Sequence, residues 1–193
     1  MRNGEADIVG AILAGGQSRR FGVDKAQVRL GSATLLERAI DSLRPFDSSP
    51  LVIGRPPHLD ERAGLGPLAG LETALRKLPT SANHLLLIAV DMPGINFELL
   101  QAIASAPNAD VVVPYHDNRF HPLCSRWHRR VLPTITHILD RGERSMHSAL
   151  DCLGVHSLTE EVLQRMGVSN PAHTLSNIND RDDLQRFIDR GGA

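Results

Sequence analysis

Residues 8–25 read IVGAILAGGQSRRFGVDK, and they contain the clearest structural signal in the chain. The apolar run over residues 8–14 is typical of a buried strand, and the glycines after it indicate a loop. Glycines let a backbone turn tightly, and successive N–H groups in such a turn bind anions. Arg19 and Lys25 add positive charges suited to phosphate oxygens. We therefore predict a strand followed by a phosphate-binding loop.

The spacing of this loop separates it from two common nucleotide-binding motifs. It is not a Walker A loop, because Gly22 is not followed directly by Lys and Ser or Thr. No G-x-G-x-x-G pattern occurs here either, which excludes the dinucleotide fingerprint. By composition alone, a flexible basic surface loop is the alternative.

Strand and helix signals alternate from this loop to residue 113. Apolar runs predict strands, and apolar residues at helical spacing predict helices. The strands are expected at residues 8–14, 51–53, 84–90 and 110–113, and the helices at 34–43, 68–78 and 97–104. Residues 54–66 are rich in Pro and Gly and predict a loop. Such alternation is typical of an α/β fold with a parallel sheet between two layers of helices.

The rest of the chain is less regular, with helices expected at residues 131–139, 145–153 and 180–188. We predict one domain over residues 1–193, a three-layer α/β/α, Rossmann-like arrangement with a mostly parallel sheet. Its nucleotide-binding part would cover roughly residues 1–113, and its acceptor-binding part roughly residues 114–193.

Composition narrows the class of partner. The 193 residues carry a formal net charge of −1, without the basic excess of nucleic-acid-binding proteins. A small-molecule substrate is therefore expected. Cys124 and Cys152 form no Cys-x-x-Cys pair, and buried free thiols are expected rather than a disulfide. A polar N-terminus and the absence of a long apolar run predict a cytoplasmic protein without a membrane segment.

Asp91 closes the most apolar predicted strand. Ligands of parallel sheets bind outside the carboxyl ends of the strands, so Asp91 and the loop after Ala14 are expected to converge. Mg²⁺ prefers one or two carboxylates, completed by phosphate oxygens and water. Asp91 is therefore the candidate metal ligand. The alternative is a structural role in capping the bend at residues 92–94.

Five motifs in order resemble one known family. The pattern LAGGxSxRFGxDK over residues 13–25 resembles the signature of the nucleotide-sugar-pyrophosphorylase-like superfamily. Its double glycine and following Asp24-Lys25 resemble the molybdenum cofactor guanylyltransferase family. The later motifs are weaker alone: GPLAGL at 66–71, DMP at 91–93, HPL at 121–123, and NIN at 177–179 with Asp183-Leu184.

The resemblance implies transfer of GMP from GTP to molybdopterin, with Mg²⁺ as the cofactor bound by Asp91. It implies catalytic roles for Lys25, Arg19 and Asp91. The implied GTP contacts are Leu13, Ala14, Gly15, Gly16, Gly22, Lys25, Gly54, Asp60, Gly66, Gly70 and Asp91. The implied partners are GTP and Mo-molybdopterin, and proteins that deliver molybdopterin or mature molybdoenzymes.

Two positions bear on how the nucleoside is bound. Related enzymes often carry Asn at the end of the second strand, where this chain has Gly54 followed by Arg55, so one nucleoside contact is expected to differ. An acid before the second motif is expected to contact the base or ribose, with Asp60 preferred over Glu61. The Ala-Gly-Gly run at residues 14–16, in place of Ala-Ala-Gly, favours guanine.

For the acceptor, the resemblance points to Asn177 and Asn179, with Arg144 as a further phosphate contact. The alternatives are turn and helix-cap roles for the asparagines and a solvated position for Arg144. His121 is expected to be structural. A group of three arginines is expected to form a solvated helix face: Arg126, Arg129 and Arg130.

The acceptor is itself a phosphate monoester, ionised near neutral pH, so no strong general base is expected. Three other functions stay open at this point. They are a CTP-dependent molybdopterin cytidylyltransferase, a sugar-phosphate nucleotidyltransferase, and a non-catalytic protein that binds and delivers nucleotide or cofactor.

Overall fold

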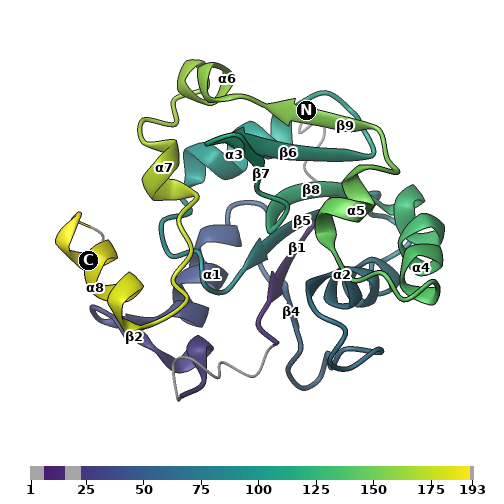
Figure 1. The fold of residues 1–193 in the computed structure, drawn as a ribbon, viewed down its shortest axis with the longest axis horizontal. Coiled ribbons are helices and arrows are strands. Elements are labelled where there is room, and N and C mark those ends of the chain that lie inside the picture. The colour runs from purple at the N-terminus through teal and green to yellow at the C-terminus, as the bar shows by residue number, and fades with distance from the viewer. Residues whose placement is uncertain (1–6, 16–22, 192–193) are drawn as a thin grey trace.

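A seven-stranded sheet forms the centre of the molecule (Figure 1). The computed structural model describes residues 7–15 and 23–191. The strand order is β4 (Leu51–Ile53), β1 (Ile8–Leu13), β5 (His84–Ala89), β8 (Cys124–His128), β6 (Val111–His116) and β7 (Arg119–Phe120), with β9 (Val155–Leu158) also paired to β6. A separate hairpin joins β2 (Arg29–Leu30) and β3 (Ala33–Thr34).

The sheet is mixed because β8 lies antiparallel between β5 and β6. Strands β4, β1 and β5 are parallel neighbours, and β6 is parallel to β9. Five of the seven strands therefore share one direction, while β7 and β8 oppose it. The predicted α/β fold with a mostly parallel sheet is confirmed, whereas strands β7, β8 and β9 and the β2–β3 hairpin were not predicted.

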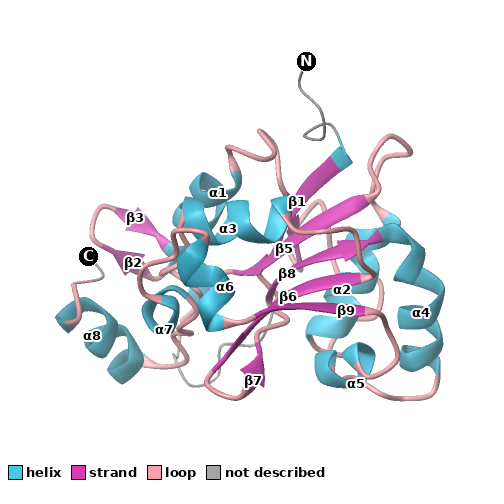
Figure 2. Cartoon of the chain, turned by 90° about the horizontal axis from the view of Figure 1, so that it is seen from above, coloured by secondary structure: helices cyan, strands magenta, loops and turns pink. Residues whose placement is uncertain are grey.

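Helices cover both faces of the sheet (Figures 1 and 2). One face carries α2 (Pro67–Arg76), α4 (Leu132–Asp140) and α5 (Met146–Leu150). The other face carries α1 (Leu35–Leu43), α3 (Phe97–Ser105), α6 (Glu160–Arg165), α7 (Pro171–Thr174) and α8 (Arg181–Asp189). Two short 3₁₀ helices, η2 (Lys25–Gln27) and η3 (Arg129–Val131), complete the described elements.

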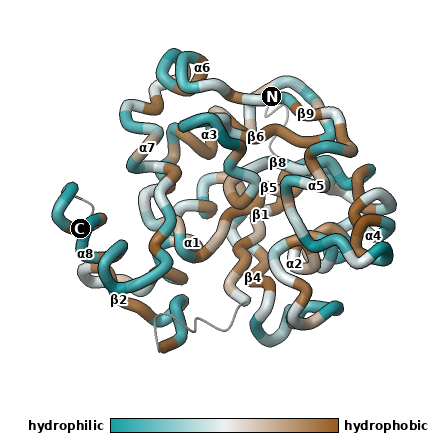
Figure 3. The backbone as a smooth tube through the Cα atoms, in the orientation of Figure 1, coloured by the Kyte–Doolittle hydropathy of each residue, from teal (hydrophilic) through white to brown (hydrophobic). Residues whose placement is uncertain are grey.

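The strands divide the core in two because successive side chains point to opposite faces. In β5, Leu86 and Ile88 pack toward α1 and α3, while Leu85 and Leu87 pack toward α2 and α4. All four side chains are buried. This two-sided burial explains why the strand is an unbroken apolar run, and Figure 3 shows the central strands among the most hydrophobic parts of the tube.

Local signals fix the helix starts. Thr34 caps α1 in a capping box, since its hydroxyl accepts from the Glu37 N–H while Glu37 accepts from the Thr34 N–H. Gly66 precedes α2 with φ of 81°, and Pro67 occupies its first turn. The predicted helices at residues 34–43 and 68–78 are confirmed within about two residues.

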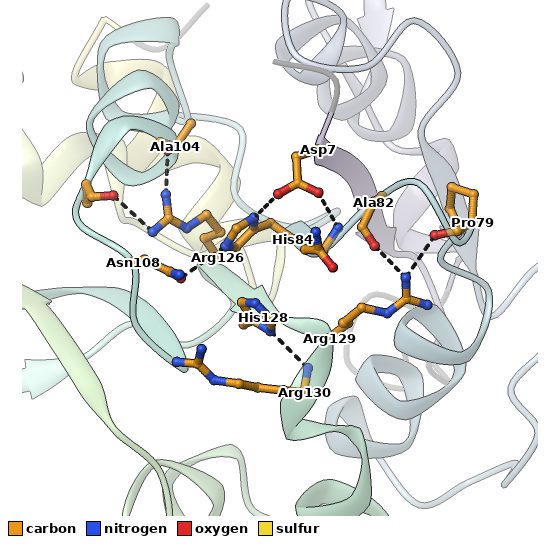
Figure 4. A network of polar contacts seen from close by, with 12 residues as sticks. Asp7, Pro79, Ala82, His84, Ala104, Asn108, Arg126, His128, Arg129 and Arg130 are labelled. Atoms are coloured by element: carbon orange, nitrogen blue, oxygen red, sulfur yellow. Dashed lines mark hydrogen bonds and ion pairs between the residues drawn. The ribbon is translucent and has the colours of Figure 1, made fainter. Parts of the chain in front are cut away.

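The prediction of a solvated helix face for three arginines is wrong for Arg126, whereas Arg130 is exposed on the 3₁₀ helix η3. Arg126 lies on β8 and is 5% exposed, and its guanidinium donates to the carbonyls of Ala104, Ala106 and Pro107. Arg129 and Arg130 lie on η3, where Arg129 also donates to backbone carbonyls (Figure 4). A strand with a charged side chain forms here because three carbonyls at the end of α3 and just beyond it accept hydrogen bonds from that charge.

Two further expectations concern the cysteines and membranes. Both cysteines are free; Cys124 is buried as expected, but Cys152 is exposed, so burial was predicted wrongly for it. Among the described residues, no helix combines the length and apolar character that a membrane crossing requires.

Candidate functional site

The carboxyl ends of three parallel strands meet at one edge of the sheet. Leu13 is in register with Ile53 on β4 and with Ala89 on β5. Just beyond, the Ala14 N–H donates to the Ile53 carbonyl at 2.9 Å, and the Val90 N–H donates to the Leu13 carbonyl at 3.0 Å. The loops that follow these strands therefore begin side by side, as parallel pairing predicts.

The ion pair between Lys25 and Asp91 lies at this edge. Lys25 Nζ is 2.9 Å from Asp91 Oδ2, and the two side chains are only 16% and 17% exposed. Lys25 opens η2, whose N-cap is Asp24, with the Asp24 carboxylate accepting from the Ala26 N–H at 3.1 Å. The loop after β1 and the strand end at Asp91 thus come together as the sequence predicts.

The other carboxylate oxygen of Asp91 has no hydrogen-bond partner in the part of the chain that the structure describes. Asp91 Oδ1 is buried, and no donor from the described residues reaches it. Among the described residues, the Asp91 carboxylate pairs with Lys25 rather than with the bend at residues 92–94. The capping alternative is therefore not the arrangement found, and a buried lone-pair site on Asp91 is open to a ligand.

A platform of glycines lies beside this pair. Gly54 has φ of 86°, and a Cβ atom there would lie 2.4 Å from the Gly15 Cα atom. A Cβ atom at Gly70 would lie 2.9 Å from Leu13 Cδ2. No side chain fits at Gly54 unless the loop moves. The three glycines let backbone segments approach each other, and a ligand, closely.

Asp60 faces this platform. Its Oδ2 atom lies 3.2 Å from the Cβ position of Gly15, and its Oδ1 atom lies 3.6 Å from that of Gly70. Asp60 Oδ1 is buried without a partner among the described residues, and burial raises the pKa of this carboxyl. Glu61 instead points to Arg76, 3.4 Å away, and is half exposed. Of the two acids considered, Asp60 lies at the site.

The residues after Asp60 hold its loop in place through an ionic network around the buried carboxylate of Glu72. The Glu61 N–H donates to Thr73 Oγ1 at 3.1 Å, and Arg62 pairs with the buried carboxylate of Glu72 at 2.9 Å. Arg76 also pairs with Glu72 at 2.9 Å. Paired charges and hydrogen bonds satisfy this carboxylate, so the loop carrying Asp60 is anchored to α2.

Unsatisfied polar atoms concentrate at this edge of the sheet. In the part of the chain that the structure describes, three buried side-chain atoms have no hydrogen-bond partner: Arg55 Nε, Asp60 Oδ1 and Asp91 Oδ1. Buried polar groups are nearly always paired in native proteins, so each exception needs an explanation. A polar ligand that supplies donors and acceptors here would explain all three.

Arg55 is a residue that the sequence argument noted only as a departure from the family pattern. It follows Gly54 and pairs with the carboxylate of Asp24, and this contact is the main cause that lowers the pKa of Asp24. No motif marks Arg55 in the sequence. Its position two residues after β4, at the carboxyl end of a parallel strand, was the signal that could have identified it.

The acceptor candidates divide between two places. The Ile178 N–H donates to the Asp91 backbone carbonyl at 2.8 Å, so the chain on either side of Ile178, with the exposed Asn177 and Asn179, runs beside Asp91. Arg144 is exposed on the connection between α4 and α5, on the opposite face of the sheet from Ile178. The backbone of the asparagine segment therefore lies next to Asp91, whereas Arg144 has no contact with this edge among the described residues.

The remaining candidates are placed as follows. Gly16, Arg19 and Gly22 lie outside the described residues. Gly66 begins α2 with φ of 81° and open space around its Cβ position. His121 is 8% exposed, its Nε2 lies 3.3 Å from the His116 carbonyl, and burial lowers its pKa. These features agree with a structural histidine.

This fold and edge arrangement define a nucleotidyltransferase-like α/β protein. The family described as the MobA-like NTP transferase domain matches residues 10–153, and the chain belongs to it. The chain is 37% identical over 155 residues to a probable molybdenum cofactor guanylyltransferase from Opitutus terrae, covering 72% of this chain and 75% of that protein. It is 32% identical over 204 residues to one from Bacillus subtilis, covering 96% of each.

A solved structure agrees with this assignment. The crystal structure of molybdopterin-guanine dinucleotide biosynthesis protein A from Archaeoglobus fulgidus superposes with a TM-score of 0.80 at 25% identity. The match covers 94% of this chain and 97% of that one. The predicted family is therefore confirmed by the comparison of folds as well as by sequence.

Proposed function

We propose that this chain is a cytoplasmic, Mg²⁺-dependent enzyme that transfers GMP from GTP to Mo-molybdopterin. The products are the guanine dinucleotide form of the cofactor and pyrophosphate. The observation that carries the proposal is the set of unpartnered buried atoms around the Lys25–Asp91 pair. Family membership and the names of the relatives supply the reaction.

The nucleoside would lie on the glycine platform. The backbone of Leu13, Ala14 and Gly15, together with Gly54 and Gly70, leaves room for close approach. The Asp60 carboxylate would accept hydrogen bonds from N–H or O–H groups of the nucleoside, which would satisfy its unpartnered oxygen. Gly16, Gly22 and Gly66 complete the set of proposed GTP contacts.

The phosphates would lie toward the Lys25–Asp91 pair. Lys25 and Arg19 are proposed to neutralise negative charge that builds up on the leaving pyrophosphate. Because Lys25 Nζ is already bound to Asp91, its ammonium group lies at the strand end where phosphates would enter. The carboxylate-bound lysine is thereby held in place before substrate arrives.

Asp91 fits a magnesium ligand. Its buried, unpartnered Oδ1 atom is a hard oxygen donor, as Mg²⁺ prefers. Among the described residues, no group of three or more His, Cys, Asp and Glu side chains gathers that could hold a metal ion. Asp91 would therefore share the ion with phosphate oxygens and water. When bound, Mg²⁺ supplies charge neutralisation on the triphosphate.

The chain's own task in the reaction is positioning. A phosphate oxygen of the acceptor would attack the α-phosphorus, a new P–O bond would form, and the bond to the β-phosphate would break. The attacking oxygen is ionised near neutral pH, so no side chain needs to remove a proton. Asn177 and Asn179 beside Asp91, and Arg144, are proposed to orient the acceptor.

The test is a nucleotide-selective assay. The protein is incubated with Mo-molybdopterin, Mg²⁺ and either GTP, CTP or ATP, and pyrophosphate release and the mass of the product are measured. GTP-dependent formation of the guanine dinucleotide is expected. If product formed only with CTP, the protein would be a cytidylyltransferase rather than a guanylyltransferase. Nucleotide binding without any pyrophosphate release would indicate a delivery protein.

A further inference from the structure

We propose that Arg55 is a positioning residue that acts through Asp24 to aim Lys25 at Asp91. The inference rests on the proposed function, because it gives a role within the same site. Arg55 is not part of any recognised motif, and its contact with Asp24 joins the end of β4 to the turn that carries Lys25.

The backbone of Arg55 is fixed. The preceding Gly54 packs against Gly15, and its N–H donates to the His58 carbonyl at 2.8 Å. The His58 N–H in turn donates to the Arg55 carbonyl at 2.6 Å. The Arg55 side chain is 26% exposed. Because these hydrogen bonds fix the turn, the Arg55 guanidinium is held in position for its ion-pair partner.

Asp24 connects the Arg55 guanidinium to the η2 turn. Its Oδ1 atom accepts from both the Arg55 guanidinium and the Ala26 N–H. The Asp24 carbonyl accepts from the Gln27 N–H at 2.9 Å, which closes the turn. The pKa of Asp24 is lowered, first by the Arg55 contact, so the carboxylate is charged at neutral pH.

Lys25 needs such support because its side chain is long. A lysine stem has several rotatable bonds, and holding it in one geometry costs side-chain entropy. The buried Ala26 anchors one side of the η2 turn, and the Val28 N–H bond to the Lys25 carbonyl at 3.1 Å closes it. The Arg55–Asp24 pair adds a tie to β4, so that Lys25 Nζ meets Asp91 at 2.9 Å.

The competing possibility is that Arg55 itself binds the nucleotide through its unpartnered Nε atom. A double-mutant cycle separates the two. The variants are Arg55→Ala, Asp24→Asn and the double variant, with Arg44→Ala as the control. Arg44 forms an exposed ion pair with Asp41 on α1, where the side chains are 66% and 59% exposed.

If Arg55 acts through Asp24, each single variant lowers kcat by on the order of 10-fold to 100-fold, as misplacement of a catalytic group does. The double variant then loses no more than the worse single variant, because both remove the same tie. Arg55→Lys restores part of the rate. Multiplicative losses, or a rise in the KM for GTP in Arg55→Ala but not in Asp24→Asn, would overturn the proposal.

A second measurement does not depend on turnover. The chain has only two lysines, Lys25 and the exposed Lys77, so labelling with an amine-reactive reagent and mass spectrometry gives a ratio with an internal reference. Arg55→Ala and Asp24→Asn should raise the Lys25 to Lys77 labelling ratio several-fold, and Arg44→Ala should not. An unchanged ratio in both variants would refute positioning, whereas an inactive wild type would refute only the proposed function.

Discussion

The two edges of the central sheet use the same residue types in opposite ways. At the amino ends of the parallel strands, His84 lies between Asp7 and Asn108, and Arg126 and Arg129 donate to backbone carbonyls (Figure 4). At the carboxyl ends, Arg55, Asp60 and Asp91 each keep a buried atom that no described residue reaches with a hydrogen bond. At the first edge, here called the satisfied edge, these polar side chains hydrogen-bond within the protein. At the second edge, three buried atoms lack such partners among the described residues.

This difference separates structural charges from those of a site. A buried arginine that donates to three carbonyls stabilises the fold, since its desolvation is offset by hydrogen bonds. A buried carboxylate oxygen without a donor lowers stability and is retained where a ligand completes its shell. Whether buried polar atoms have hydrogen-bond partners, rather than residue type or burial, therefore distinguishes the candidate functional edge of this molecule.

The largest expected effect is at Asp91. Asp91→Asn keeps the shape of the side chain but removes its charge, and GMP transfer should fall by about 10³-fold, as loss of a group that stabilises the transition state does. The free energy of unfolding should stay within about 1 kcal/mol of wild type, because the lost ion pair is offset by the loss of an unpartnered carboxylate. The initial rate of pyrophosphate release and urea unfolding measure the two quantities. Wild-type turnover in the variant would exclude Asp91 from the site.

The next effect belongs to the satisfied edge. Arg126→Met should lower the free energy of unfolding by about 3 kcal/mol, because three carbonyls lose their donor. The kcat of the folded enzyme should be unchanged, since Arg126 lies at the far end of the sheet. Urea unfolding and the GTP assay at low temperature check both parts. A fall in kcat with unchanged stability would remove the distinction between the two edges.

The sequence predicts the functional edge better than the satisfied one. Apolar runs that end at Ala14 and Asp91 predict parallel strands, and parallel strands bring their carboxyl ends together. That rule predicts that Asp91 and the loop after Ala14 converge, and the Lys25–Asp91 contact agrees with it. Asp60 is predicted by the family resemblance rather than by the periodicity of the sequence.

The satisfied edge could not be predicted in the same way. Strand β8 contains Ser125, Arg126 and Trp127, which do not form an apolar run. It is a buried strand because carbonyls from distant residues accept from Arg126, and Trp127 Nε1 donates to Ser125 Oγ at 2.6 Å. Arg55 was missed for a similar reason, because its partner Asp24 is 31 residues away in the sequence. Long-range polar pairing leaves no local pattern.

Arg144 belongs to neither edge, so it gives a smaller effect. It is exposed and has no polar partner among the described residues. If it contacts the acceptor phosphate, Arg144→Ala should raise the KM for Mo-molybdopterin by up to about 10-fold, equivalent to about 1.4 kcal/mol. The KM for GTP and the unfolding free energy should not change. Arg141→Ala, on the same connection and also exposed, is the matched control. Equal KM values for Mo-molybdopterin in wild type and Arg144→Ala would exclude Arg144 from the acceptor site. Asn177 and Asn179 would then be the remaining candidate contacts.

The smallest effect is a gain in stability at Asp60. Burial raises the pKa of this carboxyl in the folded protein, so the folded state binds the proton more tightly than the unfolded chain. Stability must then fall as pH rises from the unfolded value of 3.8 through the raised folded value, and stay reduced above it. Asp60→Asn removes this loss and should be more stable than wild type at neutral pH by up to about 1 kcal/mol.

The pH dependence of that gain decides its cause. The difference in unfolding free energy between Asp60→Asn and wild type should shrink as pH falls through the raised folded pKa of Asp60 toward the unfolded value of 3.8. Glu61→Gln is the control, because Glu61 is half exposed and lies 3.4 Å from Arg76, so its variant should show no gain at neutral pH. A gain in Asp60→Asn that is accompanied by weaker GTP binding would show that the unpartnered oxygen lowers stability and serves the ligand. A variant less stable than wild type at neutral pH would mean that Asp60, like Arg126, is satisfied by the protein itself.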